Sequence, residues 1–269
     1  MAVDSVPSID AAPDPLTPPK GRRRFDASLA LLGELILTAG VVLGLYVGWQ
    51  LFYTDVLSGR TQDAALDKIE WAEPVRVPEV KAGTSAGEDQ LIPEELKVYS
   101  AAGAPVLAEP AEATTFATLH VPRWGYDYVK PVSEGTDRAR VLDELGIGHY
   151  TGTAMPGAVG NFSVAGHRTT YGKPFTDIET LQVGDPLVVH TEDAWYVYTV
   201  TGTTIQLPTF MAAIAPVPGQ LGEQPTAASI TLTTCHPRYS AAKRYIVWGE
   251  LKYWAPTGHG FPSEVVEQK

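Results

Sequence analysis

The amino-acid sequence predicts a mainly β domain, a closed barrel or a sandwich, that follows one N-terminal transmembrane helix. Two observations carry this prediction. From about residue 114 onward, short runs rich in β-branched and aromatic residues alternate with Gly, Pro and Asp, as in strands joined by turns. Nearer the N-terminus, residues 28–53 form one apolar run, longer than the roughly 20 residues that span the hydrocarbon core of a bilayer.

Residues 1–27, before the apolar run, are expected to form a disordered cytoplasmic tail. They are polar and rich in proline, so they cannot bury enough apolar surface to order themselves. A basic cluster at 20–24 precedes the apolar run and Asp55 follows it. Because basic residues stay on the cytoplasmic side of a membrane span, this arrangement predicts a cytoplasmic N-terminus and an extracytoplasmic remainder.

The apolar run itself favours a single-pass signal anchor over a cleaved signal peptide or a buried helix. A signal peptide has a shorter apolar core and a small-residue cleavage pattern, which the following YTDVLSGR lacks. Glu34 interrupts the run only a turn or two from its cytoplasmic end. Trp49, Phe52 and Tyr53 stand at its far end, where aromatic side chains mark the membrane interface.

Residues 54–113 are expected to form an extracytoplasmic spacer. This stretch is acidic, and several prolines and a GTSAGEDQ segment break any long helix. A short helix is predicted over 61–71, with Leu66 and Ile69 on one face. The composition favours a solvated, partly disordered stalk over an independent domain.

Residues 114–255 carry the strand signals, and residues 256–269 form a polar tail without a second span. The predicted strands lie in TFATLHVP, YVKPV, NFSVAGH, DPLVVHT, AWYVYTVTGTTIQL, ASITLTTC and RYIVWGELKYW. One helical segment, TDRARVLDELG, interrupts them, with Thr136 or Asp137 as N-cap and Gly146 as its stop. Seven or eight short strands with one minor helix indicate a barrel or a sandwich.

Composition excludes several classes of function. The net charge of −11 argues against a nucleic-acid partner, which requires a clustered basic face. The single cysteine, Cys235, allows no intramolecular disulfide and no zinc site built from several thiolates. The loops show no dense carboxylate cluster of the EF-hand kind. We therefore expect no metal, calcium included, and no cofactor.

Cys235 is the first candidate for chemistry. Thr231, Thr233 and Cys235 share one face of a predicted strand, which ends at His236-Pro237 because proline cannot continue a sheet. On composition alone a lone cysteine is more often an inert, buried residue. A thiol at the mouth of a strand, however, is held on a rigid element. It then needs a partner, since only the thiolate attacks.

Several histidines could supply that partner. His167 ends the apolar strand NFSVAG, His120 and His190 stand near the ends of two other predicted strands, and His149 is a further candidate. Taken singly, a histidine at the end of a strand is more often structural than catalytic. His236 adjoins the cysteine but faces away from it if the strand geometry persists.

Three blocks of the sequence resemble the sortase family of cysteine transpeptidases. TLTTC matches the sortase signature T-L-x-T-C, RYIVWGEL resembles the arginine-led last strand of that barrel, and GTAMPGAVGNFSVAGHR resembles the segment with the catalytic histidine. The blocks follow the family's order, and the similarity covers roughly residues 114–254. AGHRTTYG and TLTTCHPRYSA are most similar to the actinobacterial housekeeping sortases called class E.

The resemblance implies an eight-stranded sortase-type β-barrel with Cys235 as nucleophile and His167 as its acid–base partner across a groove. It also implies that Arg244, on the neighbouring strand, stabilises the oxyanion or holds the substrate backbone. Lys243 and Arg238 are nearby cations, but the position directly ahead of Tyr-Ile-Val-Trp favours Arg244.

Three further residues are candidates for the substrate groove on the same resemblance. Thr234 matches the motif threonine just before the nucleophile, and Thr233 precedes it. Tyr171 lies four residues past the histidine and either contributes to signal preference or simply packs.

The function implied is cleavage of an L-A-x-T-G- or L-P-x-T-G-like sorting signal between Thr and Gly through a thioacyl intermediate. The partners would be secreted proteins with a C-terminal signal and the amine of a lipid-linked cell-wall precursor. A pilin-polymerising sortase is the alternative, although Asp185-Pro186 is followed by Leu187 rather than by the aromatic residue of its lid motif. A hydrolytic cysteine peptidase and a non-catalytic binding module on a membrane stalk are less favoured. Papain-like peptidases place the cysteine before the histidine, which is the reverse of the order here.

Overall fold

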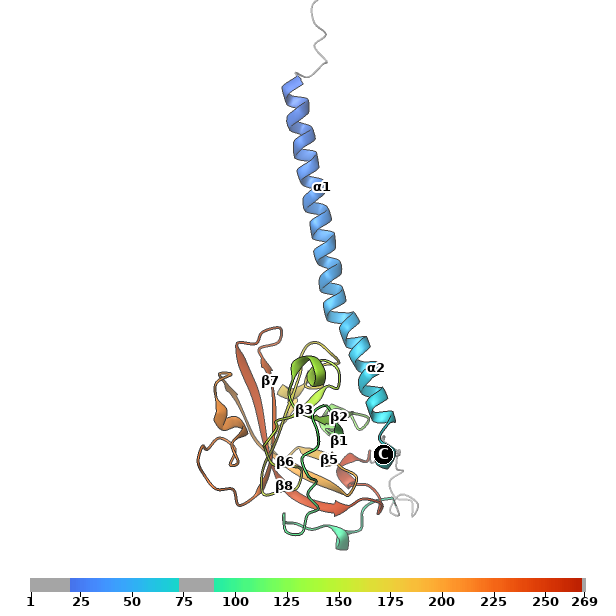
Figure 1. Cartoon of the computed structure of the whole chain (residues 1–269), viewed down its shortest axis with the longest axis vertical. Coiled ribbons are helices and arrows are strands. Elements are labelled where there is room, and N and C mark those ends of the chain that lie inside the picture. The colour runs from blue at the N-terminus through green and yellow to red at the C-terminus, as the bar shows by residue number, and fades with distance from the viewer. Residues whose placement is uncertain (1–19, 73–89, 268–269) are drawn as a thin grey trace, which may run out of the picture. The chain divides into compact units, whose positions relative to one another are not determined.

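The computed structural model describes residues 20–72 and 90–267. The chain divides into two compact units, Met1–Trp49 and Gln50–Lys269. The first unit contains helix α1, Lys20–Gly48 (Figure 1). Within α1, Ala27–Gly48 is long and apolar enough to cross a membrane, and none of its apolar window is buried in protein. The predicted apolar helix is therefore present, but it ends at Gly48, where a π-helical turn, η1 (Trp49–Tyr53), begins.

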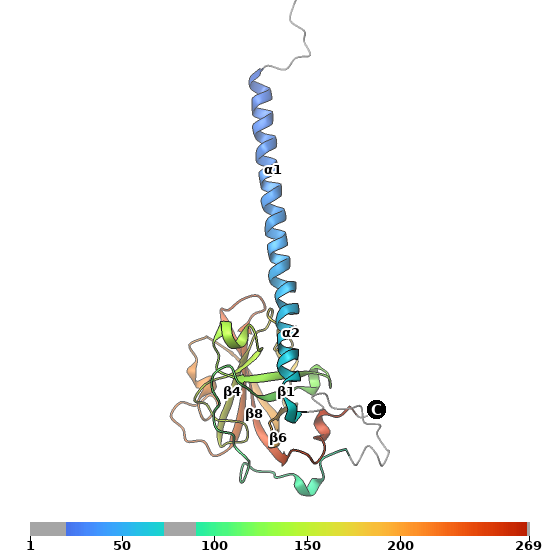
Figure 2. The same ribbon diagram turned by 45° about the vertical axis from the view of Figure 1, so that its right-hand side comes forward.

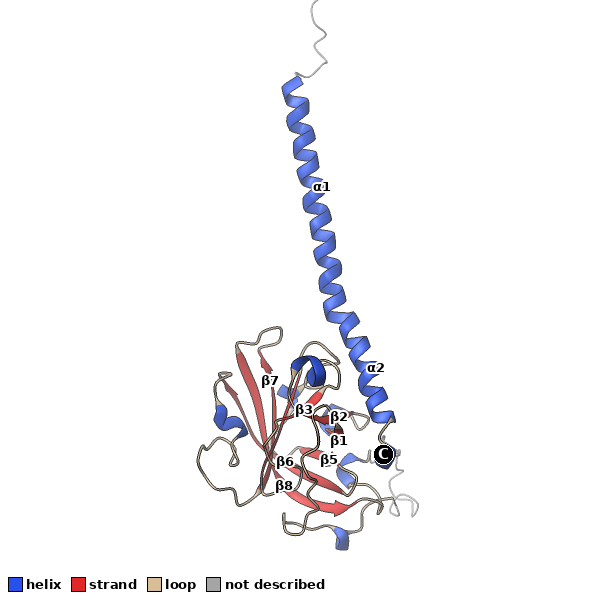
Figure 3. Ribbon diagram, viewed as in Figure 1, coloured by secondary structure: helices blue, strands red, loops and turns tan. Residues whose placement is uncertain are grey.

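The second unit is built on a closed barrel of eight strands, ordered β1-β2-β3-β4-β7-β8-β6-β5 and drawn in red in Figure 3. The strands are β1 (Thr115–His120), β2 (Val129–Glu134), β3 (Ile147–His149), β4 (Gly160–Gly166), β5 (Pro186–His190), β6 (Ala194–Gln206), β7 (Ala228–His236) and β8 (Lys243–Pro256). Two neighbouring pairs, β2 with β3 and β4 with β7, are parallel. A closed barrel, rather than a sandwich, is thus the correct form of the predicted fold.

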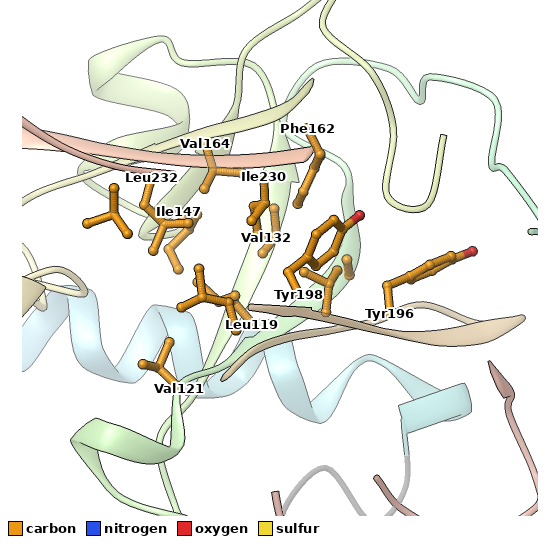
Figure 4. Close-up of a cluster of buried hydrophobic side chains, with 14 of the residues drawn as sticks. Leu119, Val121, Val132, Ile147, Phe162, Val164, Tyr196, Tyr198, Ile230 and Leu232 are labelled. Carbon is orange, nitrogen blue, oxygen red and sulfur yellow. The ribbon is translucent and has the colours of Figure 1, made fainter. Parts of the chain in front are cut away.

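The interior of the barrel is filled by aliphatic and aromatic side chains. Leu119, Ile147, Phe162, Ile230 and Leu232 are at most 1 % exposed and belong to one cluster, in which their side chains point toward one another (Figure 4). Fully burying a side chain of this size contributes roughly 1.5–3 kcal/mol. The inward position of Ile230 and Leu232 leaves the alternate residues of β7 on its other face.

Short helical turns lie between the strands, before β1 and after β8. The 3₁₀ turns are η2 (Glu70–Ala72), η3 (Glu94–Leu96), η4 (Pro122–Trp124), η6 (Ile178–Thr180), η7 (Met211–Ile214) and η8 (Ser263–Val265). The helix expected near residue 136 is a single π-helical turn, η5 (Arg138–Leu142). The N-cap prediction is confirmed for Asp137, whose side chain accepts a hydrogen bond from Arg140 N at 2.9 Å. The turn ends earlier than predicted, at Leu142 with Asp143 as its C-cap, and Gly146, with φ +93°, lies beyond it.

The region before the barrel differs from the solvated stalk expected of it. Helix α2, Thr54–Asp67, buries one stripe of side chains, Thr54, Ser58, Gln62 and Leu66, spaced four residues apart as one helix face requires. Leu66 and Ile69, the pair predicted to share a face, pack with Val129 of β2. Figure 2 shows α2 beside the barrel.

Residues 90–113 also lie along the barrel. Isolated bridges join Leu91 to Phe261 and Val98 to Trp254, and the Tyr196 hydroxyl donates to the carbonyl of Pro105. The described parts of the expected spacer therefore belong to the same compact unit as the strands. All of the GTSAGEDQ segment except its last residue, Gln90, lies outside the described residues.

Candidate active site

A cleft of about 610 Å³ opens where β4 and β7 end and β8 begins. Its lining includes Cys235, His167 and Arg244, which come from three different strands or their ends. His167 is distant in sequence from Cys235 and Arg244, and the topology explains how the three residues meet. β7 lies between β4 and β8 in the barrel, so the ends of the three strands form one side of the cleft.

Cys235 stands one residue before the end of β7. Its thiol is free and half-buried, since the alternation that sends Ile230 and Leu232 into the core sends Cys235 to the other face. Its direct cross-strand partner on β8 is Arg244. Residues directly opposite in an antiparallel pair have Cβ atoms roughly 5 Å apart, so strand pairing alone brings thiol and guanidinium together.

His167 is the first residue after β4. Because β4 runs parallel to β7 with Ala165 opposite Thr233, the same register brings His167 level with Cys235. The His167 side chain is 18 % exposed, and its Nε2 lies 2.6 Å from Oδ1 of Asp143. A carboxylate that accepts the Nε2 proton leaves Nδ1 as the free ring nitrogen for proton transfer.

Arg244 is half-buried at the start of β8. Its Nη1 donates to the carbonyls of Ala241 at 3.1 Å and Lys243 at 3.0 Å. Because a guanidinium has five N–H donors, this anchoring leaves donors for a bound carbonyl oxygen. Of the alternative cations, Lys243 does not line the cleft, and Arg238 bonds Thr176 and Asp177 elsewhere on the surface.

The three groove candidates fall in different places. Thr233 and Thr234 both line the cleft, but the Thr234 hydroxyl donates to Gly166 O at 2.7 Å and so ties β7 to β4. The Thr233 hydroxyl lies 3.0 Å from the hydroxyl of Tyr150. Tyr171 is outside the cleft lining, and its ring centroid lies 5.2 Å from that of His167. Tyr171 therefore packs on the histidine ring.

Two charged residues of the site were missed in the sequence. Asp143 contacts His167 as described, and Arg138 Nε lies 3.5 Å from the same carboxylate. Arg168 is only 2 % exposed and donates through Nη1 to the carbonyl oxygen of Cys235 at 3.4 Å. The signal for Arg168 was its place beside the histidine in AGHR, whereas Asp143 stands on an ordinary amphipathic turn.

Arg168 is buried, and it joins a polar network next to Cys235 whose carboxylate, Glu179, is exposed. Its Nη1 also donates to His236 Nδ1 at 3.0 Å, and Nη2 lies 2.5 Å from Glu179 Oε2. The hydrogen bond from Arg168 holds the pKa of the Glu179 carboxyl below its usual value. Arg168 therefore links the backbone of Cys235 to η6, the turn that carries Glu179.

The other candidate histidines, His120, His149 and His190, do not line the cleft. Burial lowers the pKa of both His120 and His190 to about 3. The ring of His190 stacks on Trp195 with centroids 3.6 Å apart. His149 is fully buried, with Nδ1 2.6 Å from Glu134 Oε2. Among the residues that the structure describes, no group of three or more His, Cys, Asp or Glu side chains is arranged to hold a metal.

Comparison with known proteins places these features in one family. The Sortase domain family matches residues 119–252, which include all three cleft residues. The chain is 35 % identical over 243 residues to Sortase SrtE1 of Streptomyces coelicolor, covering 87 % of this chain and 60 % of that protein. It is 32 % identical over 244 residues to Sortase SrtE2 of the same organism, covering 86 % of this chain and 87 % of that protein.

A solved structure agrees with the barrel described above. The crystal structure of Sortase E1 from Streptomyces coelicolor with a tripeptide in the active site superimposes with a TM-score of 0.53 at 40 % identity. The match covers 57 % of this chain and 98 % of that one. The predicted resemblance to class E sortases is thereby confirmed.

Proposed function

The chain belongs to the sortase family, and on this premise we propose that it is a membrane-anchored transpeptidase that cuts a sorting signal between Thr and Gly. The observation that carries the proposal is one cleft that holds Cys235 opposite Arg244 and His167 on the adjacent strand end. Nucleophile, acid–base group and fixed cation are the three parts that acyl transfer through a thioester requires.

In the first step the Cys235 thiolate attacks the carbonyl carbon of the signal threonine. The C–S bond forms as the C–N bond to glycine breaks, and the protonated His167 gives its proton to the departing amine. Arg244 cannot lose its own proton, so it stabilises the developing oxyanion throughout. Asp143 orients the histidine ring and supports its positive charge before the proton leaves.

In the second step an incoming amine attacks the thioester. Neutral His167 removes a proton from that amine, the new amide bond forms, and the C–S bond breaks to restore the thiolate. The amine's attack, in place of water's, makes the net reaction transpeptidation. The starting protonation states of Cys235 and His167 are also restored.

The relatives and the anchor helix support the cellular role. Similarity to SrtE1 and SrtE2 supports an L-A-x-T-G-like signal on secreted proteins, and the tripeptide in the Sortase E1 structure supports a peptide in the cleft. The apolar helix Ala27–Gly48, with basic residues before it, supports a cytoplasmic N-terminus and an extracytoplasmic barrel. The acceptor would then be the amine of a lipid-linked cell-wall precursor.

The test is mass spectrometry of the full chain in detergent, mixed with an L-A-x-T-G peptide and a glycine-type amine. Wild type should yield the ligated peptide and a thioacyl adduct on Cys235, and Cys235→Ala should yield neither. Cleavage that ignores added amine would instead indicate a hydrolase. Turnover of L-P-x-T-G alone would keep the transpeptidase and overturn the preferred signal.

A further inference from the structure

Helix α2 contacts the loop that carries the candidate catalytic histidine, residues 167–173, hereafter the histidine loop. The contact is made by Gln62, which is fully buried. Its Nε2 donates to the carbonyl of Tyr171 at 3.1 Å, and its Oε1 accepts from Lys130 Nζ at 3.3 Å. A buried amide with both ends bonded fixes its neighbours, because losing either bond leaves a desolvated polar group.

The histidine loop has a backbone that needs such support. Tyr171, Gly172 and Lys173 have φ values of +56°, +72° and +35°, and two of these residues carry a Cβ atom. Side chains are disfavoured in this left-handed region, so such a conformation persists only where its surroundings over-determine it.

Asp55, near the start of α2, provides a second attachment. Its Oδ1 accepts from the backbone nitrogen of Gly172 at 3.2 Å, and its Oδ2 lies 2.7 Å from Lys173 Nζ. Gln62 thus bonds the carbonyl of Tyr171, whereas Asp55 bonds the amide of Gly172 and the side chain of Lys173. Each of the three loop residues with a left-handed backbone is therefore attached to α2. These contacts come from two turns of the same helix.

Gln62 also sits between two segments of the site. A Cβ at Gly172 would lie 2.5 Å from the Gln62 side chain, and a Cβ at Gly146 would lie 2.9 Å from it. Gly172 belongs to the histidine loop, whereas Gly146 ends the turn that carries Asp143. The Gln62 amide thus fills the space between the segment of His167 and the segment of its carboxylate partner.

We propose that Gln62 and Asp55 are positioning residues, which hold the histidine loop where His167 meets Asp143 and faces Cys235. The inference rests on the proposed function, since it assigns these residues to the geometry of that reaction. Neither residue touches the reacting atoms. Their effect reaches the chemistry through the backbone of residues 171–173 and through the spacing between His167 and Asp143.

The test compares Gln62→Ala with Asp63→Ala, its exposed neighbour on α2, in the full chain held in detergent. Loss of the Gln62 bonds should accelerate hydrogen exchange of the 167–173 amides about tenfold, as expected for one buried hydrogen bond. In the transpeptidation assay kcat should fall about tenfold, with KM unchanged within a factor of two. Asp63→Ala should match wild type in both measurements.

Two further variants separate bonding from packing and from folding. Gln62→Met keeps the side-chain volume without the donor, so it should still lose protection of the loop. Asp55→Asn keeps the acceptor for Gly172 but loses the ion pair, and should lie between wild type and Gln62→Ala. Gln62→Met with wild-type exchange and kcat would overturn the proposal, as would a uniform loss of protection across the whole barrel. Hydrogen exchange is measured without substrate. An inactive wild type would therefore refute the proposed function, while the exchange rates would still show whether Gln62 holds the histidine loop.

Discussion

His167 and His190 look alike in the sequence, and the structure separates them. Each stands at the end of an apolar strand, His167 just after β4 and His190 as the last residue of β5. His190 lies flat on Trp195, nearly parallel to it, and burial lowers its pKa to about 3, so it stays neutral. His167 is partly exposed, lines the cleft and is hydrogen-bonded to Asp143.

The difference comes from the elements that reach each histidine from elsewhere in the chain. His190 meets aromatic rings, Trp195 from β6 and Trp71 from the turn after α2. His167 meets the carboxylate of Asp143, which directly follows the turn η5, and it lies level with Cys235 of β7. The end of a strand therefore fixes only where the imidazole lies. The side chains around it determine whether it is buried and neutral or is suited to acid–base chemistry.

The largest test of this comparison replaces each histidine in turn. His167→Ala should lower kcat/KM by about 10³-fold, the usual loss when a general acid–base group is removed. His190→Phe, which keeps a ring to stack on Trp195, should leave kcat/KM within a factor of two at pH 7.5. The measurement is the steady-state kcat/KM for transpeptidation of both variants and wild type, with circular dichroism as the check on folding. An equal loss of kcat/KM in the two variants would contradict the different roles assigned to His167 and His190.

A smaller effect is expected from the carboxylate that distinguishes the two sites. Asp143→Asn removes the negative charge beside His167, so the imidazole loses its charged hydrogen-bond partner. We expect kcat to fall about 10- to 100-fold while KM changes less than twofold, since Asp143 acts on the ring rather than on substrate binding. Glu144→Gln, at the exposed neighbouring position, is the matched control. A loss in KM alone would assign Asp143 to substrate binding.

The smallest expected effect is the pH dependence of folding stability that comes from the buried His190. The unfolded His190 takes up a proton below pH about 6.5, whereas the folded one, with a pKa of about 3, does not. Protons therefore favour the unfolded chain, and stability falls as the pH drops from about 6.5 toward 3. At pH 5.5 this one group costs about 1.4 kcal/mol.

The measurement is the free energy of unfolding of the barrel at pH 7.5 and 5.5, for wild type and His190→Phe. The wild type should lose about 1.4 kcal/mol more than the variant between the two values. His120, whose pKa burial also lowers to about 3, remains in both proteins and cancels in the comparison. Identical acid losses would mean that His190 is protonated in the folded barrel.

Long, strongly patterned elements were predictable from the sequence, and short ones were not. β6, β7 and β8 have nine or more residues each, so alternation and β-branched residues identify them. β3 has only three residues, and it was missed. Its centre is Gly148, where a Cβ would collide with the carbonyl of Gly135. A strand with glycine at its centre lets another backbone approach closely, but it lacks the alternating apolar residues from which a strand is predicted.

Within the site, residues in motifs were predictable and residues in partner segments were not. TLTTC and AGHR pointed to Cys235 and His167, and strand pairing explains why Arg244 accompanies them. Asp143 enters from a separate turn, so its meeting with His167 depends on tertiary packing. Gly166, which also lines the cleft, leaves room for Phe175 and Pro174, on which a Cβ at this position would press.

The hairpin of β7 and β8 bears on the order in which the candidate site forms during folding. Cys235 and Arg244 face each other within this hairpin, nine residues apart in sequence, so their contact closes a short loop. His167 is 68 residues before Cys235 and arrives only through the parallel pairing of β4 with β7. Loops of that length close later and at greater entropic cost. On the proposed function, a chain that has formed only this hairpin holds Cys235 opposite Arg244 but lacks His167, so we expect no acyl transfer until β4 pairs with β7.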